Sequence, residues 1–265
     1  MKQRDRLRWM ITYLLEENAQ GQGIEIEPLL PLKEDELYHI WRGLLNTRLP
    51  YPIGDEFLKV QDDYLQEDLK SHTVMRLSDL ESVTDSLYLW QGDITKLEVD
   101  AITNAANSEF LGCFIPNHHC IDNEIQSKGG YQIRLDCYEI RSKQGRKEAI
   151  GKAKVTPAYN LPSQWIIHTV GPIAWDGVTE FKKRLLAQAY RSVLAMADEI
   201  GAQSLALSCI STGQFGFPKD QAALIAIQTT REYLKQTHSP LKVVFNVFLD
   251  EDYAIYQELL KQKEI

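Results

Sequence analysis

Two cysteines and two histidines lie close together in the segment Asn104 to Asn123 (NAANSEFLGCFIPNHHCIDN), which follows an apolar run. Cys113, His118 and Cys120 form the pattern Cys-x4-His-x-Cys, which places two sulfur ligands and one imidazole near one another in the chain. Zinc favours this mixture of ligands, and three protein ligands leave a fourth position for water or substrate, as catalytic sites require. The pattern predicts one zinc ion per chain.

Other interpretations of these residues stay open. His119 offers a second imidazole beside His118, and the spacing also allows a Cys113–Cys120 disulfide or two buried thiols next to surface histidines. The segment matches neither the paired CxxC of a zinc ribbon nor HExxH, and it lacks the H-x-E…P-C-x-x-C pattern of nucleobase deaminases. It therefore predicts a metal site of a different kind.

Three polar side chains flank the predicted ligands. Asp122 follows Cys120 by two residues, a position from which it could act as a base, orient a metal ligand, or cap a helix over Asn123 to Lys128. Asn104 and Asn107 place amide donors and acceptors at the end of the preceding strand. In each of these roles, a carboxylate or amide side chain would lie beside the predicted metal.

A second loop, Ser211 to Pro218 (STGQFGFP), joins a predicted strand to a predicted helix. Gly213 and Gly216 let its backbone approach a ligand closely, and the helix that follows presents unpaired N–H groups at its positive dipole end. Such a loop binds phosphate without Lys or Arg, which suits a chain of net charge −8. The alternative is an ordinary strand–helix connection. We expect the two loops to close over one phosphate-bearing ligand.

A short motif, Gln91 to Thr95 (QGDIT), follows the first predicted strand of this region. Gly92 permits a tight turn, and the Asp93 carboxylate beyond it is able to accept a hydrogen bond from an amino group such as that of adenine. A plain turn capped by the aspartate explains the same residues.

Short apolar runs indicate five buried strands, at residues 87–90, 101–104, 165–168, 205–207 and 243–247. Helical patterns lie between them, at 181–200 and from Ala222 to Leu234. This alternation predicts an α/β layered fold around a largely parallel sheet, in which ligands bind at the carboxyl ends of strands. Both special loops lie at such ends. Cys137, Cys209 and His168 are expected in the core.

Residues 1–80 have a different character. Amphipathic helices are expected over residues 1–19, 34–46 and 57–70, with a loop over 20–31 and a proline-containing break at 49–52. No cluster of reactive side chains occurs there. We therefore predict an N-terminal helical extension (1–80) that buries an apolar face, followed by one α/β domain (81–265).

Composition excludes several classes of protein. With 29 basic and 37 acidic residues, the chain is not expected to bind nucleic acid through its charge. Its uncharged apolar stretches are far shorter than the roughly 18 residues of a membrane helix, and its N-terminus lacks the features of a signal peptide. Four cysteines in such a chain do not suggest a disulfide framework. We expect a soluble, cytoplasmic protein with no membrane partner.

Taken together, GDITKLEVDAITNAAN, CIDN and STGQFGFP resemble the macrodomain family of ADP-ribose binders and hydrolases over about residues 80–262. The family usually has a run of glycines where this chain has Gly112 to Cys120, and a later histidine where it has Gln126. That replacement, with the helical extension, resembles the zinc-dependent subgroup of microbial protein-ADP-ribose hydrolases, often associated with sirtuin-type ADP-ribosyltransferases. The resemblance implies a three-layer macrodomain with a mixed, largely parallel sheet and helices on both faces.

The resemblance also implies residue roles. Cys113, His118 and Cys120 become the zinc ligands, Asp122 the acid residue of the catalytic loop, and Asn107 a catalytic contact to the distal ribose. Substrate contacts are implied for eleven residues, with Asp93 at the adenine amino group, Phe215 near the distal ribose and Phe248 stacking on adenine: Asp93, Ile94, Asn104, Asn107, Ser211, Thr212, Gly213, Gln214, Phe215, Gly216 and Phe248.

The function implied is a zinc-dependent hydrolase that removes mono-ADP-ribose from modified proteins. It would cleave the bond at the anomeric carbon of the distal ribose, in a carboxylate ester linkage, with zinc coordinating a ribose hydroxyl or the attacking water. The alternatives are a non-catalytic ADP-ribose-binding module and an O-acetyl-ADP-ribose deacetylase. The partners expected are ADP-ribose, a mono-ADP-ribosylated protein and, through function, a sirtuin-type ADP-ribosyltransferase.

Overall fold

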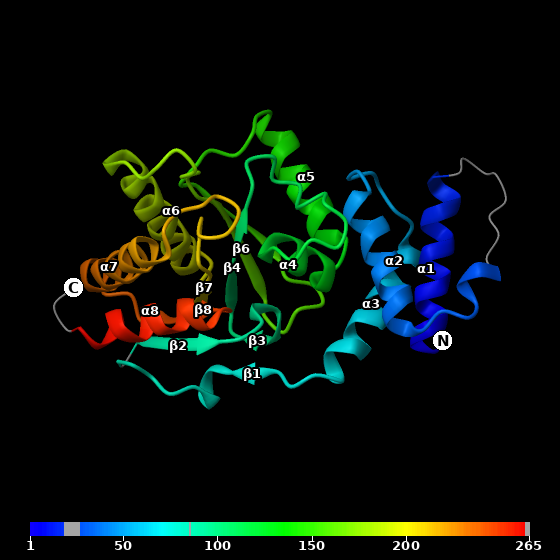
Figure 1. Ribbon diagram of the computed structural model, residues 1–265, viewed down its shortest axis with the longest axis horizontal. Helices are drawn as coiled ribbons and strands as arrows, with labels where there is room; N and C mark the ends of the chain where they lie inside the picture. The colour runs from blue at the N-terminus through cyan, green and yellow to red at the C-terminus, as the bar shows by residue number, and fades with distance from the viewer. Residues whose placement is uncertain (19–26, 85, 263–265) are drawn as a thin grey trace.

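A computed structural model describes residues 1–18, 27–84 and 86–262 (Figure 1). Three helices come first: α1 (Gln3–Asn18), α2 (Glu34–Thr47) and α3 (Asp55–Lys70), each close to its predicted position. The loop predicted over residues 20–31 lies largely outside the described residues, and its described end forms the short 3-10 helix η1 (Glu27–Leu29).

One apolar cluster joins these three helices. Leu7 of α1, Trp41 of α2 and Phe57 of α3 are fully buried in it. Residues three or four apart share one face of a helix, which is why the apolar spacing of each helix produces a buried stripe. Tyr131, from the other part of the chain, belongs to the same cluster, so the N-terminal helices pack against the remainder of the molecule.

The rest of the chain is built on a six-stranded sheet in the order β2-β8-β7-β4-β6-β5. Its strands are β2 (Leu87–Gln91), β4 (Ala101–Ala106), β5 (Ala153–Pro157), β6 (Trp165–Val170), β7 (Ser204–Leu207) and β8 (Lys242–Val247). Only the edge strand β5 is antiparallel to its neighbour, which confirms a mixed, largely parallel sheet. The sequence reasoning missed β5 because its residues (AKVTP) contain no continuous apolar run.

Short elements accompany the sheet. β1 (Met75–Arg76) and β3 (Leu97–Glu98) form a separate two-stranded sheet, which the sequence reasoning also missed. The 3-10 helices η2 (Leu77–Asp79) and η3 (Ile94–Lys96) lie next to them in the chain. These elements carry the chain from the N-terminal helices past the edge of the main sheet (Figure 1).

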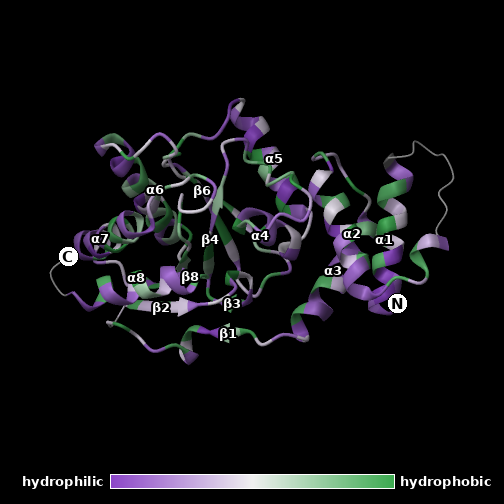
Figure 2. Ribbon diagram, viewed as in Figure 1, coloured by the Kyte–Doolittle hydropathy of each residue, from purple (hydrophilic) through white to green (hydrophobic). Residues whose placement is uncertain are grey.

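Helices cover both faces of the main sheet (Figure 1). α6 (Glu180–Glu199), α7 (Lys219–Thr237) and α8 (Asp250–Lys261) pack on one face, and α4 (Ile121–Gly129) and α5 (Gln132–Gln144) on the other. Successive strand side chains point to opposite faces, so Ala101 and Ile102 belong to different apolar clusters. Figure 2 shows hydrophobic residues along the inner strands and a mixture of hydrophobic and hydrophilic residues along the helices.

The parallel strands bring the two special loops to one edge of the sheet. β4 and β7 are paired in parallel, so the segments that follow them, 107–120 and 208–218, leave the sheet on the same side. This edge is the usual ligand-binding side of an α/β sheet. Within the described parts of the chain, every helix is too short or too polar to cross a membrane.

Candidate functional site

A cavity of about 610 Å³ lies at this edge of the sheet. Its wall consists of the end of β4 with the following loop, the loop after β7, and the segment that joins β8 to α8. Eleven of the predicted site residues line it: Asn107, Cys113, His118, Cys120, Asp122, Ser211, Thr212, Gly213, Gln214, Phe215 and Phe248. The structure therefore brings both predicted loops to one cavity.

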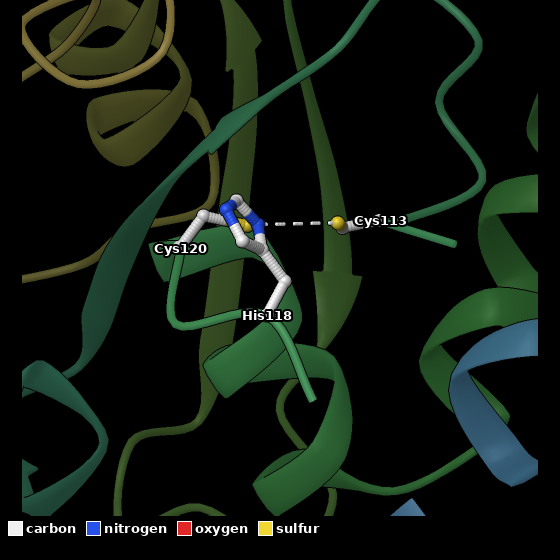
Figure 3. Close-up of side chains that lie close together, drawn as sticks. All are labelled: Cys113, His118 and Cys120. Atoms are coloured by element: carbon white, nitrogen blue, oxygen red, sulfur yellow. Dashed lines mark hydrogen bonds between the residues drawn. The ribbon is translucent and has the colours of Figure 1, made fainter. Parts of the chain in front are cut away.

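Cys113, His118 and Cys120 gather within the wall (Figure 3). One donor atom from each lies within 4.8 Å of the other two, and the Cys113 Sγ is 3.5 Å from the His118 Nδ1. Among the described residues, this is the one group of three or more His, Cys, Asp and Glu side chains arranged closely enough to hold a metal ion. His119 is exposed and turns toward Glu124 instead.

The two thiols affect each other's ionisation. The neighbouring Cys120 side chain lowers the pKa of Cys113 to about 5, whereas Cys113 and burial raise the pKa of Cys120. Thiolates are the form of cysteine that binds metals, so a lowered pKa at Cys113 would favour metal binding there. Two sulfurs and an imidazole nitrogen fit a metal ion that prefers soft and borderline ligands.

Asp122 lies buried beside this group. Its Oδ1 accepts a hydrogen bond from Asn104 Nδ2 at 2.8 Å, and its Oδ2 lies 3.5 Å from Asn107 Nδ2. Burial raises the pKa of Asp122 to about 6, and the hydrogen bond from Asn104 opposes that rise. Cys120, not Asp122, is the N-cap residue of α4, so the interpretation of Asp122 as a helix cap is wrong. The helix begins two residues earlier than the sequence suggested.

A chain of buried hydrogen bonds holds Asp122 in place. Asn104 Nδ2 also donates to His168 Nδ1 at 3.0 Å, and His168 Nε2 lies 2.9 Å from Thr156 Oγ1. Burial lowers the pKa of His168 to about 3, so the ring is neutral and its Nε2–H donates to Thr156. His168 is thus a hydrogen-bonded core histidine, as predicted, and it orients the amide that touches Asp122.

The loop after β7 presents a row of free backbone donors. Among the described residues, the N–H groups of residues 211–215 donate to no protein acceptor. The loop closes on itself, because Gly216 N donates to Gly213 O and Phe217 N to Ser211 O, both at 3.0 Å. Ser211 has a left-handed φ of 70°, and α7 begins at Lys219 directly after the loop. Such nests of N–H groups at a helix N-terminus bind anions.

The remaining predicted residues are not part of the cavity wall as the described residues define it. Asp93 accepts hydrogen bonds from Thr95 and pairs with Lys128 Nζ at 2.6 Å. Its burial opposes ionisation, but the ion pair with Lys128 keeps the pKa of Asp93 below its usual value. Ile94 is buried next to it. Asn104 donates a hydrogen bond to Asp122, and Gly216 closes the loop after β7, as described above.

Several residues of the wall escaped the sequence reasoning. Lys219, Asn246 and Asp252 line the cavity, with Lys219 Nζ 3.3 Å from Asp252 and Asn246 donating to Gly92 O at 3.0 Å. Cys209, expected in the core, also lies in this wall. The position of Lys219 directly after the loop 211–218 was a sequence feature that could have identified it, whereas no sequence feature pointed to Asn246 or Asp252.

The chain is similar to known proteins over most of its length. Residues 103–226 match the family described as the Macro domain. The "Protein-ADP-ribose hydrolase" of Staphylococcus aureus (strain MRSA252) is 48% identical over 250 residues, which are 94% of each chain. A "Probable bifunctional ADP-ribose hydrolase/ADP-ribosyltransferase" of Fusarium oxysporum f. sp. cubense is 38% identical over 83% of this chain and 40% of its own.

A solved structure shows the same fold. The macrodomain of Oceanobacillus iheyensis with ADP has a TM-score of 0.61 and 36% sequence identity, and the similarity covers 69% of this chain and 94% of that one. The shared fold, the match over residues 103–226 and the identity over nearly the whole chain all indicate the same family. The chain belongs to the macrodomain family.

Proposed function

We propose that this chain is a zinc-dependent hydrolase that removes mono-ADP-ribose from modified proteins, by cleaving the bond at the anomeric carbon of the distal ribose. The observation that carries the proposal is the meeting, around one cavity, of the Cys-His-Cys group, the buried Asp122 and the row of free N–H donors. The name of the S. aureus relative supports the same activity.

Cys113, His118 and Cys120 would hold the zinc ion, since their donor atoms already lie within 4.8 Å of one another. When bound, zinc supplies a Lewis acid that lowers the pKa of a coordinated water or hydroxyl. The fit rests on the chemistry of the donors, which are two cysteine sulfurs and an imidazole nitrogen.

Asp122 acts in this proposal as the base or the orienting group at the distal ribose. Its carboxylate is held by Asn104 at 2.8 Å, so it is aimed without rearrangement. Asn107 holds the distal ribose; its amide already spans from Asp122 to the carbonyl of Gly112, at 3.0 Å. Both side chains line the cavity and would touch the reacting part of the substrate.

The diphosphate would lie on the N–H groups of residues 211–215, which provide charge stabilisation without a Lys or Arg side chain. We assign Phe215 to the distal ribose, and Asp93 with Ile94 to adenine. Phe248 is 70% exposed, so a stacked adenine would cover an aromatic ring that is otherwise in solvent. Binding far from the scissile bond helps to position the reacting carbon.

Three further assignments complete the proposal. The linkage cleaved is a carboxylate ester. A functional link to a sirtuin-type ADP-ribosyltransferase accords with the Fusarium relative, whose name joins hydrolase and transferase. Residues 1–80 form a helical extension to the catalytic domain (81–265), and among the described residues none of the first 80 lines the cavity.

The test is the metal content of the purified protein, with hydrolysis of a mono-ADP-ribosylated protein measured before and after chelation. We expect near-stoichiometric zinc, loss of activity on chelation and its return with added zinc. His118→Ala should lose the metal, whereas the neighbouring His119→Ala should keep it.

Other outcomes would replace the proposal. Zinc and ADP-ribose binding without hydrolysis would make the protein a binding module. Release of acetate from O-acetyl-ADP-ribose, with no release of ADP-ribose from protein, would make it a deacetylase. Full activity without zinc would overturn the metal mechanism and leave the macrodomain fold standing.

A further inference from the structure

Arg42 of α2 is a buried cation that reaches out of the N-terminal helices. Its Nη2 lies 2.8 Å from the backbone carbonyl of His118, 2.9 Å from Asn123 Oδ1 and 2.8 Å from Glu124 Oε1. The arginine is only 4% exposed, so these acceptors replace water as its partners. One guanidinium therefore joins α2 to a predicted metal ligand and to the first turn of α4.

Asn46 makes a second connection from the same face of α2, one turn after Arg42. Its Oδ1 accepts a hydrogen bond from the backbone N–H of Asn117 at 3.0 Å, and its Nδ2 donates to Ser127 Oγ at 3.2 Å. Between the two lies Gly43, where an added Cβ would be 3.2 Å from Asn117 Nδ2. The helix thus packs directly on the loop that carries the ligands.

The cysteine end of the loop is connected to α2 as well. Arg134 of α5 is 2% exposed, and its Nη1 lies 2.8–2.9 Å from the carbonyls of Leu45, Asn46 and Arg48 at the end of α2. Its Nη2 is 3.5 Å from the carbonyl of Cys113. A cation at a helix C-terminus is favourable, so this contact holds α2 and the loop in one arrangement.

Asn123 connects Arg42 to the middle of the loop through hydrogen bonds at both ends of its amide. This side chain is fully buried; its Nδ2 donates to the carbonyl of Ile115 at 3.0 Å, while its Oδ1 accepts from Arg42. Residues 107–120 contain no helix or strand of their own. The path of their backbone therefore depends on hydrogen bonds from side chains of the neighbouring helices. These bonds reach the backbone groups of residues 113, 115, 117 and 118.

We propose that the N-terminal helices are a positioning element of the metal site, acting through Arg42 and Asn46. The inference rests on the proposed function, in which Cys113, His118 and Cys120 hold the metal. Neither residue touches a donor atom; each sets the path of the backbone that carries the donors. Removing a hydrogen-bond partner of a metal-ligating side chain typically changes metal affinity by about 10-fold to 100-fold, and we expect a loss within this range when the backbone that carries the ligands is released.

The test uses three full-length variants, Arg42→Gln, Asn46→Ala and the matched control Arg48→Gln. Arg48 directly follows α2 and is also buried, but its side chain bonds to Glu17 and Tyr131 and to carbonyls of residues 49–52. Affinity is measured by competition between protein and chelator for cobalt(II), whose absorbance reports thiolate coordination, and for zinc. Thermal unfolding of the metal-free proteins is measured in parallel.

We expect Arg42→Gln and Asn46→Ala to bind both metals about 10-fold to 100-fold more weakly, with a changed cobalt spectrum. Arg48→Gln should unfold at lower temperature and bind the metals as the wild type does. Asn46→Ala removes no charge, so it tests the inference even where Arg42→Gln fails to fold. Wild-type affinity in the Arg42 and Asn46 variants, or equal weakening in Arg48→Gln, would overturn the inference alone. A wild-type chain that binds no metal would overturn the proposed function as well.

Discussion

Gly171, directly after β6, is a position where a single added methyl group should disturb the loop 211–218, the proposed diphosphate site. A Cβ at this position would lie 2.0 Å from Ser211 Oγ and 2.6 Å from Ile210 Cγ2, whereas ordinary contacts begin at 3.4 Å. The Gly171→Ala variant therefore requires shifts of roughly 1.4 Å and roughly 0.8 Å in these two atoms. Ser211 is the first residue of the row of free N–H donors, so the displacement reaches the proposed diphosphate site.

The larger of the two shifts is the easier to make. Ser211 Oγ has no hydrogen-bond partner and can change rotamer. Ile210 is fully buried and β-branched, so its methyl group moves only with its backbone. Overpacking of this kind costs about 1–3 kcal/mol. If this cost must be overcome for the loop to adopt the conformation that binds ADP-ribose, the binding free energy is reduced by the same amount. ADP-ribose then binds about 5-fold to 150-fold more weakly.

Isothermal titration of ADP-ribose into full-length protein measures this loss, and thermal unfolding shows whether the variant is folded. Ser211→Ala alone should bind nearly as the wild type does, since the hydroxyl has no partner. Combined with Gly171→Ala, it should recover part of the loss, because it removes the closest contact. A folded Gly171→Ala protein with unchanged affinity for ADP-ribose would refute the assignment of the diphosphate to this loop.

Two further predictions concern Phe248 in the cavity wall and the buried His168 behind Asn104. Phe248→Ala should weaken binding of ADP-ribose by about 1–3 kcal/mol through lost stacking but leave binding of ribose 5-phosphate unchanged; equal losses for both ligands would contradict the adenine assignment. His168 is neutral in the folded state with a pKa of about 3, whereas its unfolded pKa is about 6.5. The unfolded chain therefore binds the extra proton as the pH falls below 6.5, and stability is lost by about 2 kcal/mol at pH 5. Denaturant unfolding at pH 7 and pH 5 should show a smaller pH dependence in His168→Gln; an equal dependence would assign the acid sensitivity to other groups.

Features that depend on neighbours in the chain were predictable from the sequence. Cys113, His118 and Cys120 span eight residues, so a short loop was enough to bring them together, and the structure places them within 4.8 Å. The strands before the two special loops were apparent as apolar runs, because strands covered on both faces have no polar side to present. Parallel pairing then placed both loops at one edge of the sheet.

Features that depend on distant residues were not predictable. β5 pairs with β6 at the edge of the sheet, and its five residues (AKVTP) are too few and contain no continuous apolar run by which the strand could have been recognised. Asn246 and Asp252 line the cavity through the position of β8 and α8, and no local pattern distinguished them. The helix cap assigned to Asp122 was an error of two residues in a helix boundary, which local sequence defines poorly.

The sequence by itself determined the α/β architecture, the two loops that meet at the cavity and the spacing of the sulfur and imidazole donors. The tertiary structure alone decided how these donors and the neighbouring Asp122 are supported. Asn104 meets His168 across 64 positions of the chain, and Arg42 meets the His118 carbonyl across 76. Such contacts leave no periodic trace in a sequence, because a hydrogen bond between distant residues exists only after the chain has folded around its apolar cores.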